Sequence, residues 1–262
     1  MSSSAIALIV VLIVLMFIGL PITWALGGAC IVAIFLDPTL SVSMITQKIF
    51  TGCDNFSMLA LPAFFLAGDI MSKGGLSKRL VAFADSFVGW ISGGISLVSI
   101  VACTFFAAIS GSSVATTAAI GGLMYPEMVK RGYPKDYSAA VQAIGGTLGI
   151  VIPPSTVFVI YGNITGVSVA KLLMAGVLPG IICGVLLCIY AYYKAKKCNF
   201  PKEAGFSFKR FLVSFKDAIW ALIMPIVILG GIYAGIFTPT ESAVVAVFYG
   251  FLVCMAIYRE IS

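Results

Sequence analysis

Histidine is absent from the 262-residue sequence, and only 10% of its residues carry a charge. Without imidazole, Ser–His and Cys–His catalysis is excluded, and most transition-metal sites lose a common ligand. Seven cysteines are scattered through mostly apolar runs with no CxxC pair, so we interpret them as small buried hydrophobic residues. No basic segment precedes the first apolar residues, so a cleaved signal peptide is not expected.

Apolar residues make up 61% of the chain, whereas ordinary soluble domains contain about 45–50%. A water-soluble fold could not bury this much apolar surface, so we predict an all-α integral membrane protein with several membrane-spanning helices. The net charge of +6 comes from short basic clusters between apolar runs. Such clusters encode membrane topology, and they do not indicate a nucleic-acid partner.

The sequence contains long apolar blocks, and a helical crossing needs about 20 such residues. Gly19-Leu20-Pro21 divides the first block into two short crossings or one sharply broken crossing, because proline cannot continue a regular helix. The amphipathic segment 76–92 predicts a helix that lies on the membrane surface. The blocks cover residues 5–36, 56–71, 93–126, 137–162, 170–193, 217–236 and 241–258.

The block 93–126 is too long for one crossing, and basic residues flank both of its ends. The positive-inside rule assigns both flanks to the cytoplasmic side. We therefore predict a re-entrant hairpin over 93–129 with its tip at Ser110-Gly111-Ser112-Ser113. The flanking residues are Lys78 and Arg79 before the block, and Lys130, Arg131 and Lys135 after it.

A second interruption lies within 137–162, where several glycines precede Pro153-Pro154-Ser155. Consecutive prolines remove two backbone donors and free carbonyl groups, and Ser155 or Thr156 could cap the helix that resumes. Irregular backbone at membrane depth is tolerated only where it is buried in protein or lines a cavity. Freed carbonyls and hydroxyls suit Na⁺, and a helix beginning near Ser113 suits a carboxylate, so the two breaks predict one binding site.

Other interpretations of these features stay open. Small residues and proline kinks can serve helix packing alone. Another secondary transporter of ions or solutes, or a channel, with a related hairpin architecture would also contain these features, and a non-transporting scaffold would also contain membrane helices. Asp69 is interpreted as a helix-end partner of Lys73 or as a functional acid, and Glu241 as an acid at a helix N-terminus. Because neither resembles a proton relay, sodium coupling is favoured over proton coupling. An intramembrane enzyme is disfavoured, because a serine enzyme needs histidine and an aspartyl enzyme needs two membrane aspartates.

Several longer motifs occur in order along nearly the whole chain. They are GLPITWALG (19–27), LALPAFFLAGDIMSKGGLSKRL (59–80), FFAAISGSSVATTAAIGGLMYPEMVKRGY (105–133), GGTLGIVIPPSTVFVIYG (145–162), LLMAGVLPG (172–180) and GGIYAGIFTPTESAVVAVFYG (230–250). Together they resemble the large membrane subunit of tripartite ATP-independent periplasmic (TRAP) transporters.

The resemblance implies a Na⁺-driven, elevator-type secondary transporter in the bacterial inner membrane, with two inverted repeats that each carry a re-entrant hairpin. It implies uptake of an organic acid, such as a C4-dicarboxylate or sialic acid, delivered by a periplasmic substrate-binding protein. A small four-helix membrane subunit is the second implied partner. No enzymatic activity and no cofactor are expected, with Na⁺ as the coupling ion.

By motif match, the resemblance assigns sodium binding to the hairpin tip and to the broken helix. The sodium-site residues are Ser110, Gly111, Ser112, Ser113, Gly149, Pro153, Pro154 and Ser155. Substrate contacts are expected from the helix starts, at Ser112, Ser113, Ser155 and Thr156. No transition-metal site is expected.

The chain is expected to divide into three parts. Residues 1–92 form scaffold helices with an interfacial arm helix, and residues 93–193 form half of a transport domain with the hairpin (93–129) and the broken helix (137–162). Residues 194–262 form a basic cytoplasmic loop and the start of a second repeat, because 239–253 weakly echoes 21–35. Members of the family carry a second hairpin and a second Pro-Pro break, so we expect the chain to be truncated at its C-terminus.

Overall fold

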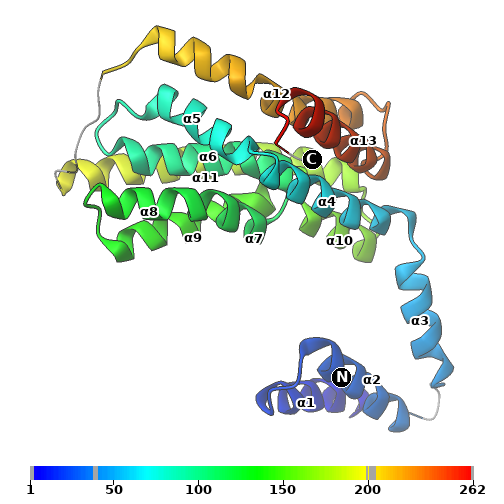
Figure 1. Cartoon of the computed structure of the whole chain (residues 1–262). Coiled ribbons are helices and arrows are strands. Elements are labelled where there is room, and N and C mark those ends of the chain that lie inside the picture. Colours follow the sequence, from blue (N-terminus) through cyan, green and yellow to red (C-terminus); the bar gives the residue numbers. More distant parts are fainter. Residues whose placement is uncertain (1–2, 38–40, 199, 201–204, 261–262) are drawn as a thin grey trace. The chain divides into compact units, whose positions relative to one another are not determined.

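The computed structural model describes residues 3–37, 41–198, 200 and 205–260 (Figure 1). Every regular element in these residues is a helix, which confirms the predicted all-α class. The chain separates into two compact units, Met1–Asn55 and Phe56–Ser262. The functional division at residues 92 and 193 stays a prediction.

The first unit contains α1 (Ser3–Phe17), α2 (Ile22–Phe35) and α3 (Ser43–Cys53). The predicted break is observed, because Gly19 has a φ of +89° and Pro21 caps the start of α2. The helices α1 and α2 pack against each other, and α2 buries small residues four positions apart, at Ala25, Ala29 and Ala33. The block 5–36 therefore forms two short helices.

The second unit contains the remaining helices (Figure 1). They are α4 (Ala60–Lys73), α5 (Leu76–Val88), α6 (Gly94–Ser110), α7 (Ser113–Thr116), α8 (Gly122–Lys130), α9 (Lys135–Val151), α10 (Thr156–Thr165), α11 (Val169–Lys197), α12 (Phe208–Tyr233) and α13 (Pro239–Leu252). Short 3₁₀ and π-helical turns extend them at Phe56–Leu59, Thr117–Gly121 and Val253–Ile257.

Several of these helices are long enough to cross a bilayer. Within the described residues, four continuous helical segments pass by length and apolar composition, and a fifth passes if the bent pair α9–α10 counts as one span. The four are Phe56–Lys73, Val169–Lys197, Phe208–Tyr233 and Pro239–Ile257. The chain is thus a multi-pass membrane protein, as its composition indicates.

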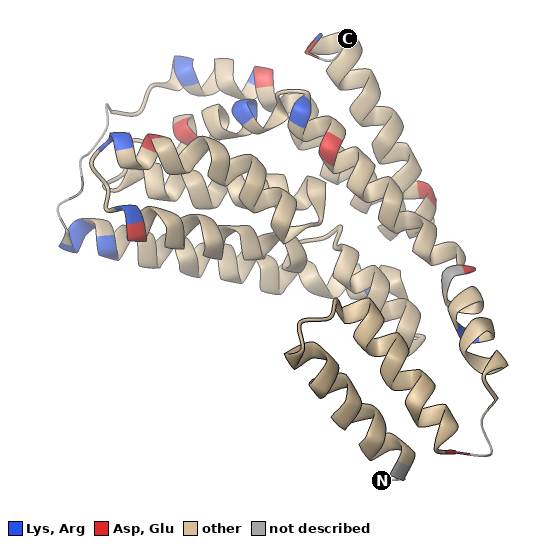
Figure 2. Cartoon of the chain, turned by 60° about the horizontal axis from the view of Figure 1, so that its bottom comes forward, with Lys and Arg blue, Asp and Glu red and all other residues tan. Residues whose placement is uncertain are grey.

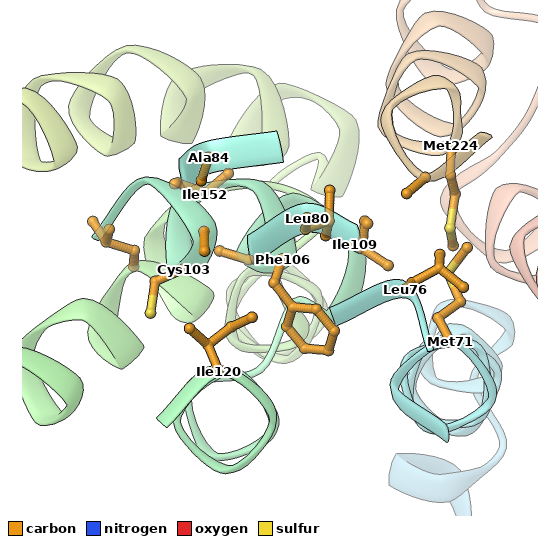
Figure 3. Packing of buried hydrophobic residues seen from close by; sticks show 14 of the residues in the cluster. Met71, Leu76, Leu80, Ala84, Cys103, Phe106, Ile109, Ile120, Ile152 and Met224 are labelled. Atoms are coloured by element: carbon orange, nitrogen blue, oxygen red, sulfur yellow. The ribbon is translucent and has the colours of Figure 1, made fainter. Parts of the chain in front are cut away.

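A buried core surrounds α6 in the second unit (Figure 3). Phe106 and Ile109 of α6 lie among side chains from α5, from the second hairpin arm and from the α9–α10 break. The expected burial of the cysteines is confirmed for Cys103 and Cys254. It is wrong for Cys183 and Cys198, which are exposed because the outer face of α11 is largely uncovered in this chain. The side chain of Cys53 lies outside the described residues.

The helix predicted to lie on the membrane surface is α5. Its apolar face is where the sequence places it, but Leu76, Leu80 and Phe83 are buried against protein. The ring of Phe83 lies 5.6 Å from that of Phe105 on α6 and 5.7 Å from that of Phe211 on α12. The apolar face of α5 therefore packs on α6 and α12, and Phe87, whose ring lies 6.4 Å from that of Phe211, remains 51% exposed.

The predicted basic loop after residue 193 is shorter than expected. Helix α12 begins at Phe208, because Ser207 accepts a hydrogen bond from the backbone nitrogen of Arg210 at 3.5 Å and caps the helix. Arg210 also forms an ion pair with Asp85 of α5. Lys209, Arg210 and Lys216 therefore belong to a helix that packs on α5.

Both ends of the predicted hairpin lie beside the end of α11. A Cβ on Gly93, just before α6, would lie 2.1 Å from Cβ of Ala195. The ring of Tyr133, just after α8, packs in a tilted arrangement on that of Phe200, with ring centroids 4.3 Å apart. Figure 2 shows lysine and arginine gathered at this end of the unit, where α8 and α11 end and α9 and α12 begin. The two arms thus start and finish together, as the charge pattern predicts.

Candidate functional site

The hairpin tip is a helix break with its own capping. Helix α6 ends at Ser110, and Gly111 adopts a left-handed φ of +61° that turns the chain back. Ser112 then caps the second arm, since its Oγ accepts a hydrogen bond from the backbone nitrogen of Ala115 at 3.4 Å. The second arm runs without interruption through α7, the π-helical turn and α8.

The second break separates α9 from α10, whose axes differ by 43°. Ser155 serves both sides of it. Its Oγ donates to the carbonyl of Ile150 at 2.7 Å and accepts from the backbone nitrogen of Phe158 at 3.4 Å. Ser155 thus provides a hydrogen-bond donor for one carbonyl at the end of α9 and caps the start of α10. The prediction that Ser155 or Thr156 caps this helix is confirmed for Ser155.

The two breaks touch each other directly. The backbone nitrogen and Oγ1 of Thr156 both donate to the carbonyl of Gly111, at 3.2 Å and 3.1 Å. A Cβ on Gly111 would lie only 2.0 Å from the carbonyl oxygen of Pro154, so only glycine fits there. The two breaks therefore lie side by side, through a contact between residues that are 45 positions apart in the sequence.

Glycines of α9 let the second arm approach closely. A Cβ on Gly149 would lie 2.5 Å from the carbonyl oxygen of Ser112, and one on Gly146 would lie 1.8 Å from Oγ1 of Thr117. The Ser112 carbonyl therefore lies against the backbone of α9. Gly149, predicted as a sodium-site residue, has a demonstrable packing role at this contact.

Thr116 is the residue that the sequence argument missed. It is fully buried, its Oγ1 donates to the carbonyl of Ser112 at 2.8 Å, and it lies 3.0 Å from Oγ of Ser110. Its position four residues after Ser112 in a helix is the signal that could have indicated it, because i and i+4 residues lie on one face.

The predicted site residues differ in how far they are buried. Ser112 and Ser113 are half-buried, and so the hairpin tip reaches the surface there. The other predicted residues are buried: Ser110, Gly111, Gly149, Pro153, Pro154, Ser155 and Thr156. The cluster therefore has a dry interior and one partly open side.

The chemistry of this cluster is that of neutral oxygen. Its polar side chains are hydroxyls, joined by backbone carbonyls at both helix breaks. Within the described residues, no group of three or more His, Cys, Asp or Glu side chains could hold a metal ion. Neutral hard oxygens without thiolate or imidazole match the ligand preference of an alkali cation and not that of a transition metal.

The two acids considered from the sequence have structural partners. Asp69 pairs with Lys73 at 2.8 Å, and both side chains are largely exposed, which supports the helix-end interpretation. Glu241 Oε2 accepts hydrogen bonds from the backbone nitrogen and the hydroxyl of Thr238, at 2.7 Å and 2.8 Å. This reciprocal cap confirms Glu241 as an acid at the start of α13.

The fold and this site define a class: a multi-pass α-helical membrane protein in which the tip of a helical hairpin contacts a broken helix. Residues 9–262 match the family model described as tripartite ATP-independent periplasmic transporter, DctM component. The chain belongs to this family, and the resemblance of its motifs to the large membrane subunit is confirmed.

Curated relatives agree with this assignment. The C4-dicarboxylate TRAP transporter large permease protein DctM of Vibrio cholerae is 43% identical over 258 residues, which are 98% of this chain and 57% of that protein. The isethionate TRAP transporter permease protein DctMQ of Oleidesulfovibrio alaskensis is 44% identical over 94% of this chain and 39% of that protein. The sialic acid TRAP transporter permease protein SiaT of Haemophilus influenzae is 35% identical over 100% of this chain and 42% of that protein. The chain thus spans about half the length of the curated relatives it matches.

Proposed function

We propose that the protein is, or is part of, the large permease subunit of a TRAP transporter that takes up an organic acid. Three relatives are named for C4-dicarboxylate, isethionate and sialic acid, which are all organic acids. The observation that supports a transport site most directly is the contact between Thr156 and the carbonyl of Gly111, because discontinuous helices that meet are typical of transporter binding sites.

Sodium coupling is the second part of the proposal. The neutral oxygen cluster around the two breaks has the ligand chemistry of a Na⁺ site. The proposed ligands are carbonyl and hydroxyl oxygens of the hairpin tip and the α9–α10 break: Ser110, Gly111, Ser112, Ser113, Gly149, Pro153, Pro154 and Ser155. The half-buried Ser112 and Ser113, with Ser155 and Thr156 at the start of α10, would face the carboxylate of the substrate, since helix N-termini attract anions.

The remaining elements of the proposal follow from the family. We place the protein in the bacterial inner membrane, where it would work with a small four-helix membrane subunit and a periplasmic substrate-binding protein. An elevator movement of the hairpin and the broken helix would carry the substrate across. The protein would act without enzymatic chemistry and with no cofactor besides the coupling ion.

Replacing Ser112 and Ser113 together by alanine tests the sodium proposal. In the complete transporter, reconstituted in liposomes with its partner proteins, the double variant should need about thirtyfold more Na⁺ for half-maximal uptake, since two oxygen ligands of about 1 kcal/mol each are lost. Replacing the exposed Ser168 by alanine, at the N-cap of α11 and beyond the C-terminal end of α10, is the control and should leave the sodium dependence unchanged.

An unchanged sodium dependence in the double variant would contradict the assignment of these serines. Uptake without a sodium gradient in the unsubstituted protein would contradict sodium coupling itself. Passive conduction of the solute in either direction, without the binding protein, would favour the channel alternative.

A further inference from the structure

A groove separate from the hairpin tip opens between α6, α9 and α11. Its volume is about 390 Å³, which falls within the range of about 300–1,000 Å³ usual for ligand pockets. Its lining is almost entirely apolar, and the small side chains of Ala140 and Ala191 leave room in it. The lining residues on α9 and α11 include Tyr137, Ala140, Ile144, Leu187, Tyr190 and Ala191.

One end of this groove is basic. Along α11 the lining face continues from Leu187 and Tyr190 to Lys194, at spacings of three and four residues, and Lys197 follows one turn later. In the part of the chain that the structure describes, neither lysine forms an ion pair. Helix α9, which lines the other wall, also begins at this end, with Lys135. Figure 2 shows this gathering of basic residues.

The tyrosines lie toward the same end. Tyr137 is in the first turn of α9, and Tyr190 is one turn before Lys194 on α11. Tyr190 is 60% exposed. The hydroxyl of Tyr137 is buried, but an exposed tyrosine such as Tyr190, with an apolar ring and a wet hydroxyl, is typical of the depth at which lipid headgroups lie. The groove thus runs from an apolar interior to a rim formed by Tyr190 and the lysines.

We propose that this groove holds one acyl chain of an anionic phospholipid, whose headgroup lies at Lys194 and Lys197. An apolar lining has few groups that could orient a polar solute, whereas a membrane protein meets acyl chains at every exposed surface. The unpaired lysines favour a negatively charged headgroup over a zwitterionic one, because anionic leaflets attract basic residues next to membrane helices. The proposal does not depend on which substrate or ion is transported.

Native mass spectrometry of the complete transporter, with phosphatidylglycerol or phosphatidylcholine added, tests the headgroup. The unsubstituted protein should retain phosphatidylglycerol preferentially. Replacing Lys194 or Lys197 by alanine should weaken that preference by about fivefold each, because one lysine near an anionic surface contributes about 1 kcal/mol. Replacing Lys171 by alanine is the control, since Lys171 lies at the opposite end of α11.

Filling the groove tests the acyl chain. Replacing Ala140 by phenylalanine should abolish retention of the lipid, whereas phenylalanine at the neighbouring exposed Ala139, which does not line the groove, should leave it unchanged. Equal retention in both variants would overturn the site. Absence of any retained lipid from the unsubstituted protein would show that another part of the protein or a second copy covers the groove, and would overturn the proposal too.

Discussion

Replacing Gly111 by alanine should reduce sodium-dependent uptake by the complete transporter by at least about tenfold. Two costs combine at this position. A left-handed φ costs an L-residue about 1–2 kcal/mol, and the new Cβ would lie 2.0 Å from the carbonyl oxygen of Pro154, where overpacking costs about 1–3 kcal/mol more. The substitution must therefore push the hairpin tip away from the α9–α10 break, and each 1.4 kcal/mol corresponds to about tenfold.

Two other glycines separate these costs. Gly166 has a φ of +74°, and nothing lies within 4 Å of the position that a Cβ would take, so alanine there carries only the backbone cost. Gly149 is helical, but a Cβ would lie 2.5 Å from the carbonyl oxygen of Ser112, so alanine there carries only the steric cost. Uptake should fall strongly for the Gly111 and Gly149 variants and little for the Gly166 variant. Similar losses at Gly111 and Gly166 would show that the contact between the breaks is unimportant.

Much of the architecture follows from local chemistry in the sequence. The hairpin could be predicted because like charges at both ends of an overlong apolar block require both ends on one side. The helix breaks could be predicted because Gly19-Leu20-Pro21 and Pro153-Pro154 cannot continue a helix. These signals act within a few residues, so they do not depend on how distant parts of the chain pack.

The features that were missed depend on contacts between distant segments. The amphipathic pattern of α5 predicts an apolar face, but the pattern cannot distinguish lipid from protein as the surface that Leu80 and Phe83 meet. The cap at Ser207 sets the first residue of α12, but the packing of this part of α12 on α5 involves Phe83, which lies more than a hundred residues before its partner Phe211. The sequence alone does not show that Gly149 makes a packing contact, because the Ser112 carbonyl that lies against it comes from a different helix.

Thr116 was also missed, although its contacts with Ser110 and Ser112 are local, and it supports the second large expectation. Replacing Thr116 by valine keeps the shape of this fully buried side chain but removes the hydroxyl that donates to the Ser112 carbonyl. The Ser110 hydroxyl loses a neighbour at 3.0 Å as well. The Ser112 carbonyl keeps the hydrogen bond from the backbone nitrogen of Thr116 at 3.0 Å, so the variant loses about 1 kcal/mol for one hydrogen bond and should have a lower melting temperature.

The dependence of that loss on Na⁺ distinguishes a structural role from a role at the ion site. An ion that binds only the folded protein stabilises it, and the stabilisation increases with the affinity and the concentration of the ion. If the hydroxyl cluster holds the coupling ion, the rise in melting temperature on adding Na⁺ should shrink or vanish in the Thr116→Val variant and return in Thr116→Ser, which restores the hydroxyl. Thr147→Val is the control, because Thr147 is exposed on α9 and bonds only its own helix, at the carbonyl of Ile144. An equal sodium-induced rise in all three variants would place the ion elsewhere and leave the Ser110–Thr116 pair as a packing element of the hairpin.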